Sequence, residues 1–285
     1  MMAKRKEILP LNGKPLNGKP QDITVEFERF TCGLAQKALD NMIKNRPVDH
    51  TRVGVMCDMV RNNEWEEYNG DTVKFSPVGQ LLDGQHRMHM VLRMGKPMEF
   101  LVARGVPEKA FSTIDQIKPR SLGQLFSIAG EKSYTHLASA VRTFHMLSLG
   151  KSLGLSRSMR LTPGAAFKLL KKHPELRTAV SFAYEADARS VMGLGAFAGA
   201  YYACSLKDKK LAEDFFWSLG TGENLLREDN VYKLRKRFLQ EQASLEKINR
   251  MSRLSLLIKV WNAERSGEKI EQLHLTKADT DSVIK

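Results

Sequence analysis

Residues 81–90 read LLDGQHRMHM, and this stretch decides the fold of the first half of the chain. Two leucines are followed by an unbroken polar row, and apolar residues then return at helical spacing. The change from a short apolar run to this spacing predicts a strand that leads directly into a helix. Asp83 stands at the change, and its carboxylate is expected to cap the helix by accepting the backbone N–H of Gln85 or His86.

The first turn of this helix is a candidate site for an anion. A helix start has N–H groups without partners and carries the positive end of the helix dipole, so it favours a phosphate. Gly84 and Gln85 would let the phosphate approach, and Arg87 would hold it by a bidentate contact. His86 would donate a hydrogen bond or act as acid or base, and Asp83 would orient its neighbours or bind a metal that bridges phosphates. The candidate catalytic residues are therefore Asp83, His86 and Arg87.

Two other interpretations fit the same residues. In the first, Asp83 only caps the helix, Gln85 and His86 are solvated, and Arg87 pairs with an acid. In the second, Asp83, His86 and His89 hold a metal ion, although Arg87 among them argues against a cation site. The sequence does not decide between these alternatives and does not identify a metal.

The spacing of apolar residues predicts an α+β protein in two parts. Strand and helix signals alternate over residues 23–132. Strands are expected at 23–31 and 96–106, and two short strands are expected within residues 69–82, which begin with a turn at 69–71. Residues 133–265 show helical stripes and no strand signal. Residues 1–22 are expected to be a flexible basic arm, and residues 266–285 a loose tail. Helices are expected at 32–45, 50–65, 83–95, from Pro107, and at 121–130, 134–149, 163–172, 176–188, 191–205, 208–219, 230–242 and 250–265. Ser121 is expected to cap the helix at 121–130, and Pro163 to begin the helix at 163–172. In the last helix, Leu254, Leu257, Ile258 and Trp261 are expected to form a core stripe.

The charge of the chain favours a polyanionic partner. The net charge is +13, and residues 133–285 contain 25 Lys and Arg against 16 Asp and Glu. Nucleic acid is the commonest polyanion that such a surface attracts. Four cations in the segment VYKLRKRFLQ could line a DNA backbone, although a solvated helix face is an equal alternative: Lys233, Arg235, Lys236 and Arg237.

The compartment is expected to be the cytoplasm. Cys32, Cys57 and Cys204 are too widely spaced to form a metal motif and suggest reduced, buried thiols. The longest apolar stretch, residues 191–204, is shorter than a membrane span needs and fits a closely packed internal helix. No membrane partner is expected, and the sequence is compatible with a homodimer.

The segment LLDGQHRMHMVLRMGKPMEFLVARGV (residues 81–106) resembles the DGQHR-type members of the ParB/sulfiredoxin-like superfamily, which phages and mobile elements often encode. The likeness extends upstream over NNEWEEYNGDTVKFSPVGQLL (62–82) and downstream over AFSTIDQIKPRSLGQLFSIAGEK (110–132), and in weaker form over most of residues 23–265. Its one specific motif is the pentapeptide 83–87. Relatives tend to show an Asp-Thr-Gly turn near the position of Asp115, but this chain lacks that glycine.

The resemblance implies a small mixed sheet with helices and a phosphate pocket at the turn 83–87. Members of the superfamily bind or hydrolyse a nucleoside triphosphate while clamping DNA, transfer phosphate to a small molecule, act as nucleases, or serve DNA modification. We therefore expect a DNA-associated protein with nucleotide or phosphodiester chemistry at this turn. A nucleoside triphosphate and Mg²⁺ are candidate cofactors, but the sequence identifies neither. Non-catalytic DNA binding and small-molecule kinase activity are the alternatives. Arg104, Lys118 and Arg120 are candidates for the rim of the pocket.

Overall fold

The computed structural model describes residues 23–114, 120–149, 161–243, 249–274 and 283–285. The expected arm at 1–22 lies outside these residues. Contacts divide the chain into two compact units, residues 1–118 and residues 119–285. The coarse prediction of a small mixed sheet followed by helices is confirmed.

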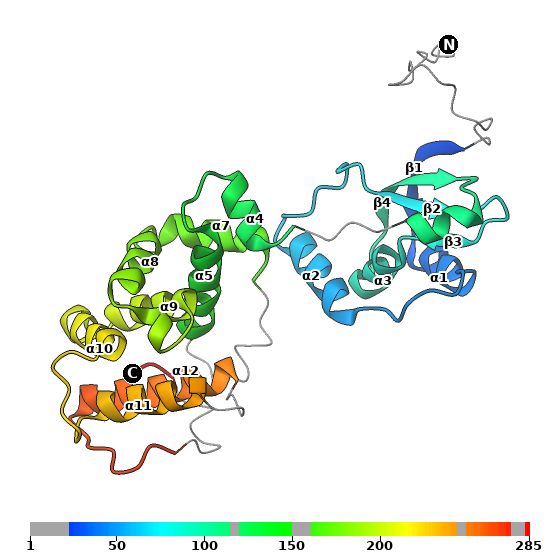
Figure 1. Cartoon of the computed structure of the whole chain (residues 1–285). Helices are drawn as coiled ribbons and strands as arrows, with labels where there is room; N and C mark the ends of the chain where they lie inside the picture. Colours follow the sequence, from blue (N-terminus) through cyan, green and yellow to red (C-terminus); the bar gives the residue numbers. More distant parts are fainter. Residues whose placement is uncertain (1–22, 115–119, 150–160, 244–248, 275–282) are drawn as a thin grey trace, which may run out of the picture. The chain divides into compact units, whose positions relative to one another are not determined.

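The first unit, here called the α/β unit, is built on a four-stranded sheet with the order β1-β4-β2-β3 (Figure 1). β1 pairs antiparallel with β4, β4 pairs parallel with β2, and β2 pairs antiparallel with β3. Lys74 of β2 lies opposite Asp83 of β3 in this register. The strands are β1 (Thr24–Phe30), β2 (Thr72–Phe75), β3 (Leu81–Asp83) and β4 (Met98–Arg104).

Three helices share the main core of the α/β unit with the sheet: α1 (Cys32–Asp40), α2 (His50–Arg61) and α3 (Gln85–Met94). Alternate residues of β2 and β4, including Val73 and Phe100, point into this core because side chains alternate along a strand. α1 and α2 begin at the side-chain caps Thr31 and Asp49. The 3₁₀ helix η1 (Glu108–Thr113), which begins at Pro107, contacts β3 within a second, smaller core.

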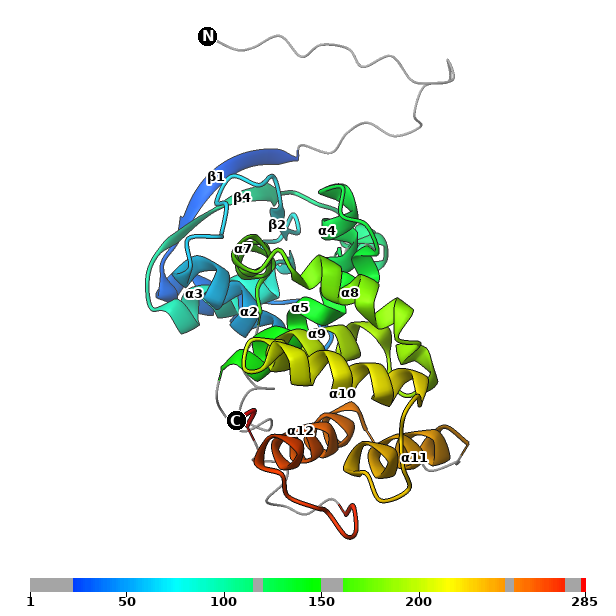
Figure 2. The ribbon, with the colours of Figure 1, turned by 90° about the vertical axis from the view of Figure 1, so that its left-hand side faces the viewer.

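The second unit, here called the helical unit, contains no strand among its described residues. The cap Ser121 and the helix start at Pro163 occur as the sequence predicts. The structure adds that Ser121 and Gln124 form a capping box at the start of α4, and that Thr162 caps α7. α11 and α12 pack against each other (Figure 2). The helices are α4 (Leu122–Ile128), α5 (Tyr134–Ser148), α7 (Pro163–Lys172), α8 (Leu176–Glu185), α9 (Leu194–Ser205), α10 (Lys209–Thr221), α11 (Asn230–Ala243) and α12 (Arg250–Ser266), with the short 3₁₀ helix η2 (Ala188–Ser190).

α9 is the internal helix that the Gly- and Ala-rich stretch 191–204 predicts, and it is buried on nearly every side. It approaches α5 closely through two glycines. A Cβ added to Gly195 would lie 2.5 Å from the backbone oxygen of His136, and one added to Gly199 would lie 2.4 Å from that of Ala140. Within the described residues, no helix is long and apolar enough to cross a membrane.

Two boundaries predicted from the sequence need correction. The division between the units lies at residues 118/119 rather than 132/133, because α4 buries Leu122 and Phe126 in the helical core. The tail 266–285 is not loose where it is described. Ile270 is 8% exposed, its N–H donates to the side chain of Asn230 at 2.8 Å, and the N–H of Lys285 donates to Asn262 at 3.0 Å.

Candidate functional site

The turn between β3 and α3 has the predicted strand-to-helix form, but its cap differs from the prediction. The N-cap residue is Gly84, with φ +112°, and no side chain caps the helix. Asp83 is still the last residue of β3, so its carboxylate does not accept the N–H of Gln85 or His86. A Cβ at Gly84 would lie 2.9 Å from Cγ1 of Val73. The glycine therefore serves the packing of the turn onto β2 as well as its positive φ.

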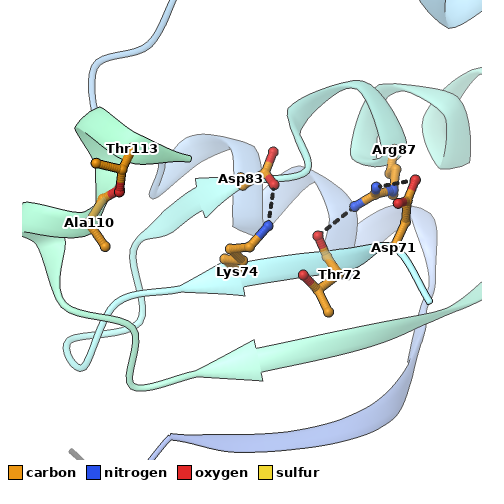
Figure 3. Close-up of polar contacts among 7 residues, drawn as sticks. All are labelled: Asp71, Thr72, Lys74, Asp83, Arg87, Ala110 and Thr113. Carbon is orange, nitrogen blue, oxygen red and sulfur yellow. Dashed lines mark hydrogen bonds and ion pairs between the residues drawn. The ribbon is translucent and has the colours of Figure 1, made fainter. Parts of the chain in front are cut away.

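Asp83 forms an ion pair across the sheet (Figure 3). The Nζ of Lys74 donates to its Oδ2 at 2.7 Å, and both side chains are about one quarter exposed. Lys74 was not among the residues expected at this site. The strand pattern DTVKF places Lys74 and Thr72 on one face, but the pairing register that brings Lys74 opposite Asp83 cannot be read from the sequence.

Arg87 is also held by internal partners. Its Nη1 donates to the carbonyl oxygen of Thr72 at 2.6 Å, and its Nη2 lies 3.1 Å from Oδ2 of Asp71. Figure 3 shows this group and the Lys74–Asp83 pair as two separate contacts at different points along β2. The phosphate-pocket hypothesis requires the side chains of Asp83 and Arg87 to converge on a shared ligand position. They do not converge in this way.

His86 and Gln85 connect α3 to the segment before α2. His86 is 9% exposed, and its Nε2 accepts the backbone N–H of Asp49 at 3.2 Å. Asp49 is the N-cap of α2, and hydrogen bonds from the N–H groups of Arg52 and Thr51 lower the pKa of its carboxyl. Gln85 is 5% exposed, and its Nε2 donates to the carbonyl oxygen of Arg46 at 3.5 Å. Neither side chain is solvated, which corrects the plainer interpretation of the sequence.

Of the three residues expected at the rim of the pocket, only Arg104 is described within the α/β unit. Arg104 makes two hydrogen bonds of 2.6 Å to Glu28, which raise the pKa of Arg104, and its guanidinium lies 4.5 Å from the ring centroid of Phe75. Lys118 lies outside the described residues. Arg120 is exposed and belongs to the helical unit.

The alternative of a metal site at Asp83, His86 and His89 is not supported. Within the described part of the chain, no group of three or more His, Cys, Asp or Glu residues could hold a metal ion. The ring of His89 lies beside that of His50, with centroids 6.3 Å apart. Burial and this second histidine lower the pKa of His89.

Three of the four cations predicted to line DNA in α11 are engaged in internal contacts. Arg235 donates to the carbonyl oxygen of Leu219 at 2.7 Å and also to that of Gly220, so it caps the end of α10. Lys233 donates to the carbonyl oxygen of Ile270 at 2.6 Å. Arg237 pairs with the buried Glu241 at 2.7 Å. Only Lys236 of the four is exposed without a partner among the described residues. The cluster is therefore not a free basic surface.

Comparison with family models, with curated proteins and with solved structures finds no match. The resemblance to the ParB/sulfiredoxin-like superfamily therefore stays a prediction. Function therefore has to be argued from the geometry of the chain itself. In that geometry, the polar side chains of residues 83–87 bind groups on other segments of the α/β unit.

Proposed function

We propose that the protein is DNA-associated and that its helical unit contacts the phosphate backbone. Residues 119–285 contain 27 Lys and Arg against 17 Asp and Glu, so most of the positive charge belongs to this unit. Neutralising phosphates releases counterions from DNA, and this term supplies most of the affinity of sequence-independent binding. The proposal is that of a binding protein whose Asp-Gly-Gln-His-Arg turn is structural.

A row of lysines on α7 carries the proposal. Lys168, Lys171 and Lys172 are spaced by three and four residues, so they share one face of the helix, and all three are exposed. None of them has a carboxylate partner within 4 Å among the described residues. The opposite face of α7 buries Ala166 and Leu170 in the helical core, which fixes the row on a rigid support. A row of unpaired cations on a packed helix suits a phosphate backbone.

The turn at 83–87 argues against catalysis as the first choice. A phosphate clamp needs an accessible guanidinium, whereas that of Arg87 is held by Thr72 and Asp71 and its side chain is only 15% exposed. An acid or base needs access to substrate, whereas the Nε2 of His86 is occupied by Asp49. Nucleotide or phosphodiester chemistry at this turn is the competing proposal. It requires a ligand that displaces these partners.

Fluorescence anisotropy with a labelled DNA duplex, at salt concentrations from about 50 to 200 mM, tests the proposal. We expect log Kd to change linearly with log salt concentration. Substituting Gln for Lys168, Lys171 and Lys172 together should lower the slope by about one for each lysine that meets a phosphate. The matched control substitutes Gln for three exposed cations of the α/β unit, Arg29, Lys37 and Lys44, and should change the slope less.

Failure of the protein to bind DNA at the lowest salt concentration would refute the proposal. If the two triple variants change the slope equally, α7 is not the surface that contacts DNA. Incubation with labelled triphosphates and Mg²⁺ distinguishes the competing enzyme. Turnover that Arg87→Ala abolishes would support chemistry at the turn. Triphosphate turnover without DNA affinity, dependent on one metabolite, would indicate a small-molecule kinase.

A further inference from the structure

A cavity of about 370 Å³ lies between α5 and the start of α12 in the helical unit. Two arginines, two shorter polar residues and two methionines line it: Arg142, Arg250, Thr143, Asn249, Met146 and Met251. This lining contains no carboxylate among the residues that the structure describes. Cavities of this size are large enough for small organic ligands.

Arg250 is anchored at one edge of the cavity. It is the first residue of α12, after the N-cap Asn249, and its Nη2 donates to the hydroxyl oxygens of Thr143 and Ser139, the latter at 3.3 Å. A guanidinium has five N–H donors, so the Nε and Nη1 of Arg250 retain donors that no described residue accepts.

The anchor itself is rigid. Thr143 is 1% exposed, and its hydroxyl donates to the carbonyl oxygen of Ser139 at 2.9 Å. Gly199 of α9 lies against it, since a Cβ added there would come within 2.7 Å of Cβ of Thr143. The close approach of α5 and α9 therefore fixes the position at which Arg250 is held.

The cavity concentrates positive charge that none of its described lining residues neutralises. Arg142 is exposed and has no ion pair within the described chain. Both guanidinium groups line the one cavity, and burial, followed by the like charge of Arg142, lowers the pKa of Arg250. The start of α12 adds the positive end of its helix dipole. An anion in the cavity would relieve this repulsion.

We infer that this cavity binds a phosphate group, with Arg142 and Arg250 as its ligands. Guanidinium groups match the geometry of phosphate oxygens, and two of them can share one phosphate. Met146 and Met251 supply a flexible apolar wall, which suits the organic part of a phosphate ester. A free nucleotide and a nucleic-acid strand both present this group, and the experiment below distinguishes them. This site does not depend on the proposed contact between α7 and DNA.

Calorimetric titration of the full chain with pyrophosphate, with ATP and with a short single-stranded oligonucleotide tests the inference, with sodium chloride at matched ionic strength as the reference. We expect at least one of the three to bind, and Arg142→Gln to weaken that binding about tenfold or more, as expected for the loss of a charged hydrogen bond. Arg142 has no hydrogen bond or ion pair with the described residues, so this variant should keep the melting temperature of the unliganded protein. Lys236→Gln removes an exposed cation of α11 and should leave binding unchanged.

Binding of ATP or pyrophosphate that Arg142→Gln weakens identifies a free phosphate ester as the ligand. If Arg142→Gln weakens the binding of the oligonucleotide alone, the ligand is a nucleic-acid strand. If none of the three binds, or if Arg142→Gln and wild type bind equally, the inference is wrong and Arg250 only fastens α12 to α5. Loss of duplex binding in the α7 variant with retention of the Arg142-dependent ligand would separate this site from the proposed function.

Discussion

Replacing Gly84 by alanine should destabilise the α/β unit by about 2–6 kcal/mol. A residue with a Cβ at φ +112° costs about 1–3 kcal/mol in backbone strain. The new Cβ would also meet Val73 at 2.9 Å, and overpacking of this kind costs about 1–3 kcal/mol. Gly95→Ala is the matched control, because Gly95 has φ +67° and no atom within 4 Å of the added Cβ. It should cost only about 1–2 kcal/mol.

Thiol labelling during urea unfolding reads the two units separately. Cys57 is fully buried in the α/β unit and Cys204 is fully buried in the helical unit, so each becomes reactive when its own unit opens. Mass spectrometry of labelled peptides then gives two midpoints from one titration. Gly84→Ala should lower the midpoint for Cys57 and leave that for Cys204 unchanged.

A double-mutant cycle identifies the cause of the change. Val73→Ala removes both methyl groups that the new Cβ would meet, so the pair Gly84→Ala and Val73→Ala should cost less than the sum of the single variants. Additive costs, or a cost of Gly84→Ala no larger than that of Gly95→Ala, would refute the packing role of Gly84. Unchanged stability with loss of phosphate binding would instead favour the ligand-approach role.

Three further predictions concern the helical unit. Arg235→Met should destabilise it by about 1–3 kcal/mol in urea unfolding, because the carbonyl groups at the end of α10 lose a charged donor. Lys236→Met should change stability by less than about 0.5 kcal/mol. Equal effects of the two variants would argue against a capping role for Arg235. Gly199→Ala should strongly lower the urea midpoint for labelling of Cys204, because the added Cβ meets the backbone of α5. Gly193→Ala should not lower it, because a Cβ added there has no atom within 4 Å. The same shift in both variants would contradict this packing. Burial lowers the pKa of His145, so the stability that this residue contributes is complete above its ordinary pKa of about 6.5 and falls as the pH decreases below that value. His145→Gln should therefore flatten the dependence of melting temperature on pH below 6.5, and an unchanged dependence would be inconsistent with this shift.

The sequence predicts the elements of this fold well because their signals are local. The cap Ser121 and the helix start at Pro163 occur where predicted, and the core stripe that ends at Trp261 is buried. These features depend on neighbours three or four positions away, which the sequence shows directly. The exception is Asp83, where the strand continues one residue further and leaves the glycine after it as the cap.

The candidate site is predicted less well because its contacts are distant in sequence. Asp83 and Arg87 attract attention as a motif, but their partners are set by tertiary structure. Lys74 faces Asp83 through the register of β2 against β3, and Asp71, just before β2, meets Arg87 of α3. Arg235 looks like a free surface cation until the end of α10 is placed beside it. A helical spacing shows which residues share a face, and it does not show what lies against that face.

Because other helices surround α9, hydrogen exchange in α9 reports the opening of the whole helical unit. It contacts α5, α8 and α10, so its amide hydrogens can exchange with solvent only when most of the unit opens. The slowest exchange rates in α9 should therefore report the global free energy of unfolding of that unit. A ligand bound at a distance on α5 and α12 would slow exchange uniformly along α9 without touching it, so deuterium uptake in one peptide would register occupancy anywhere in the unit.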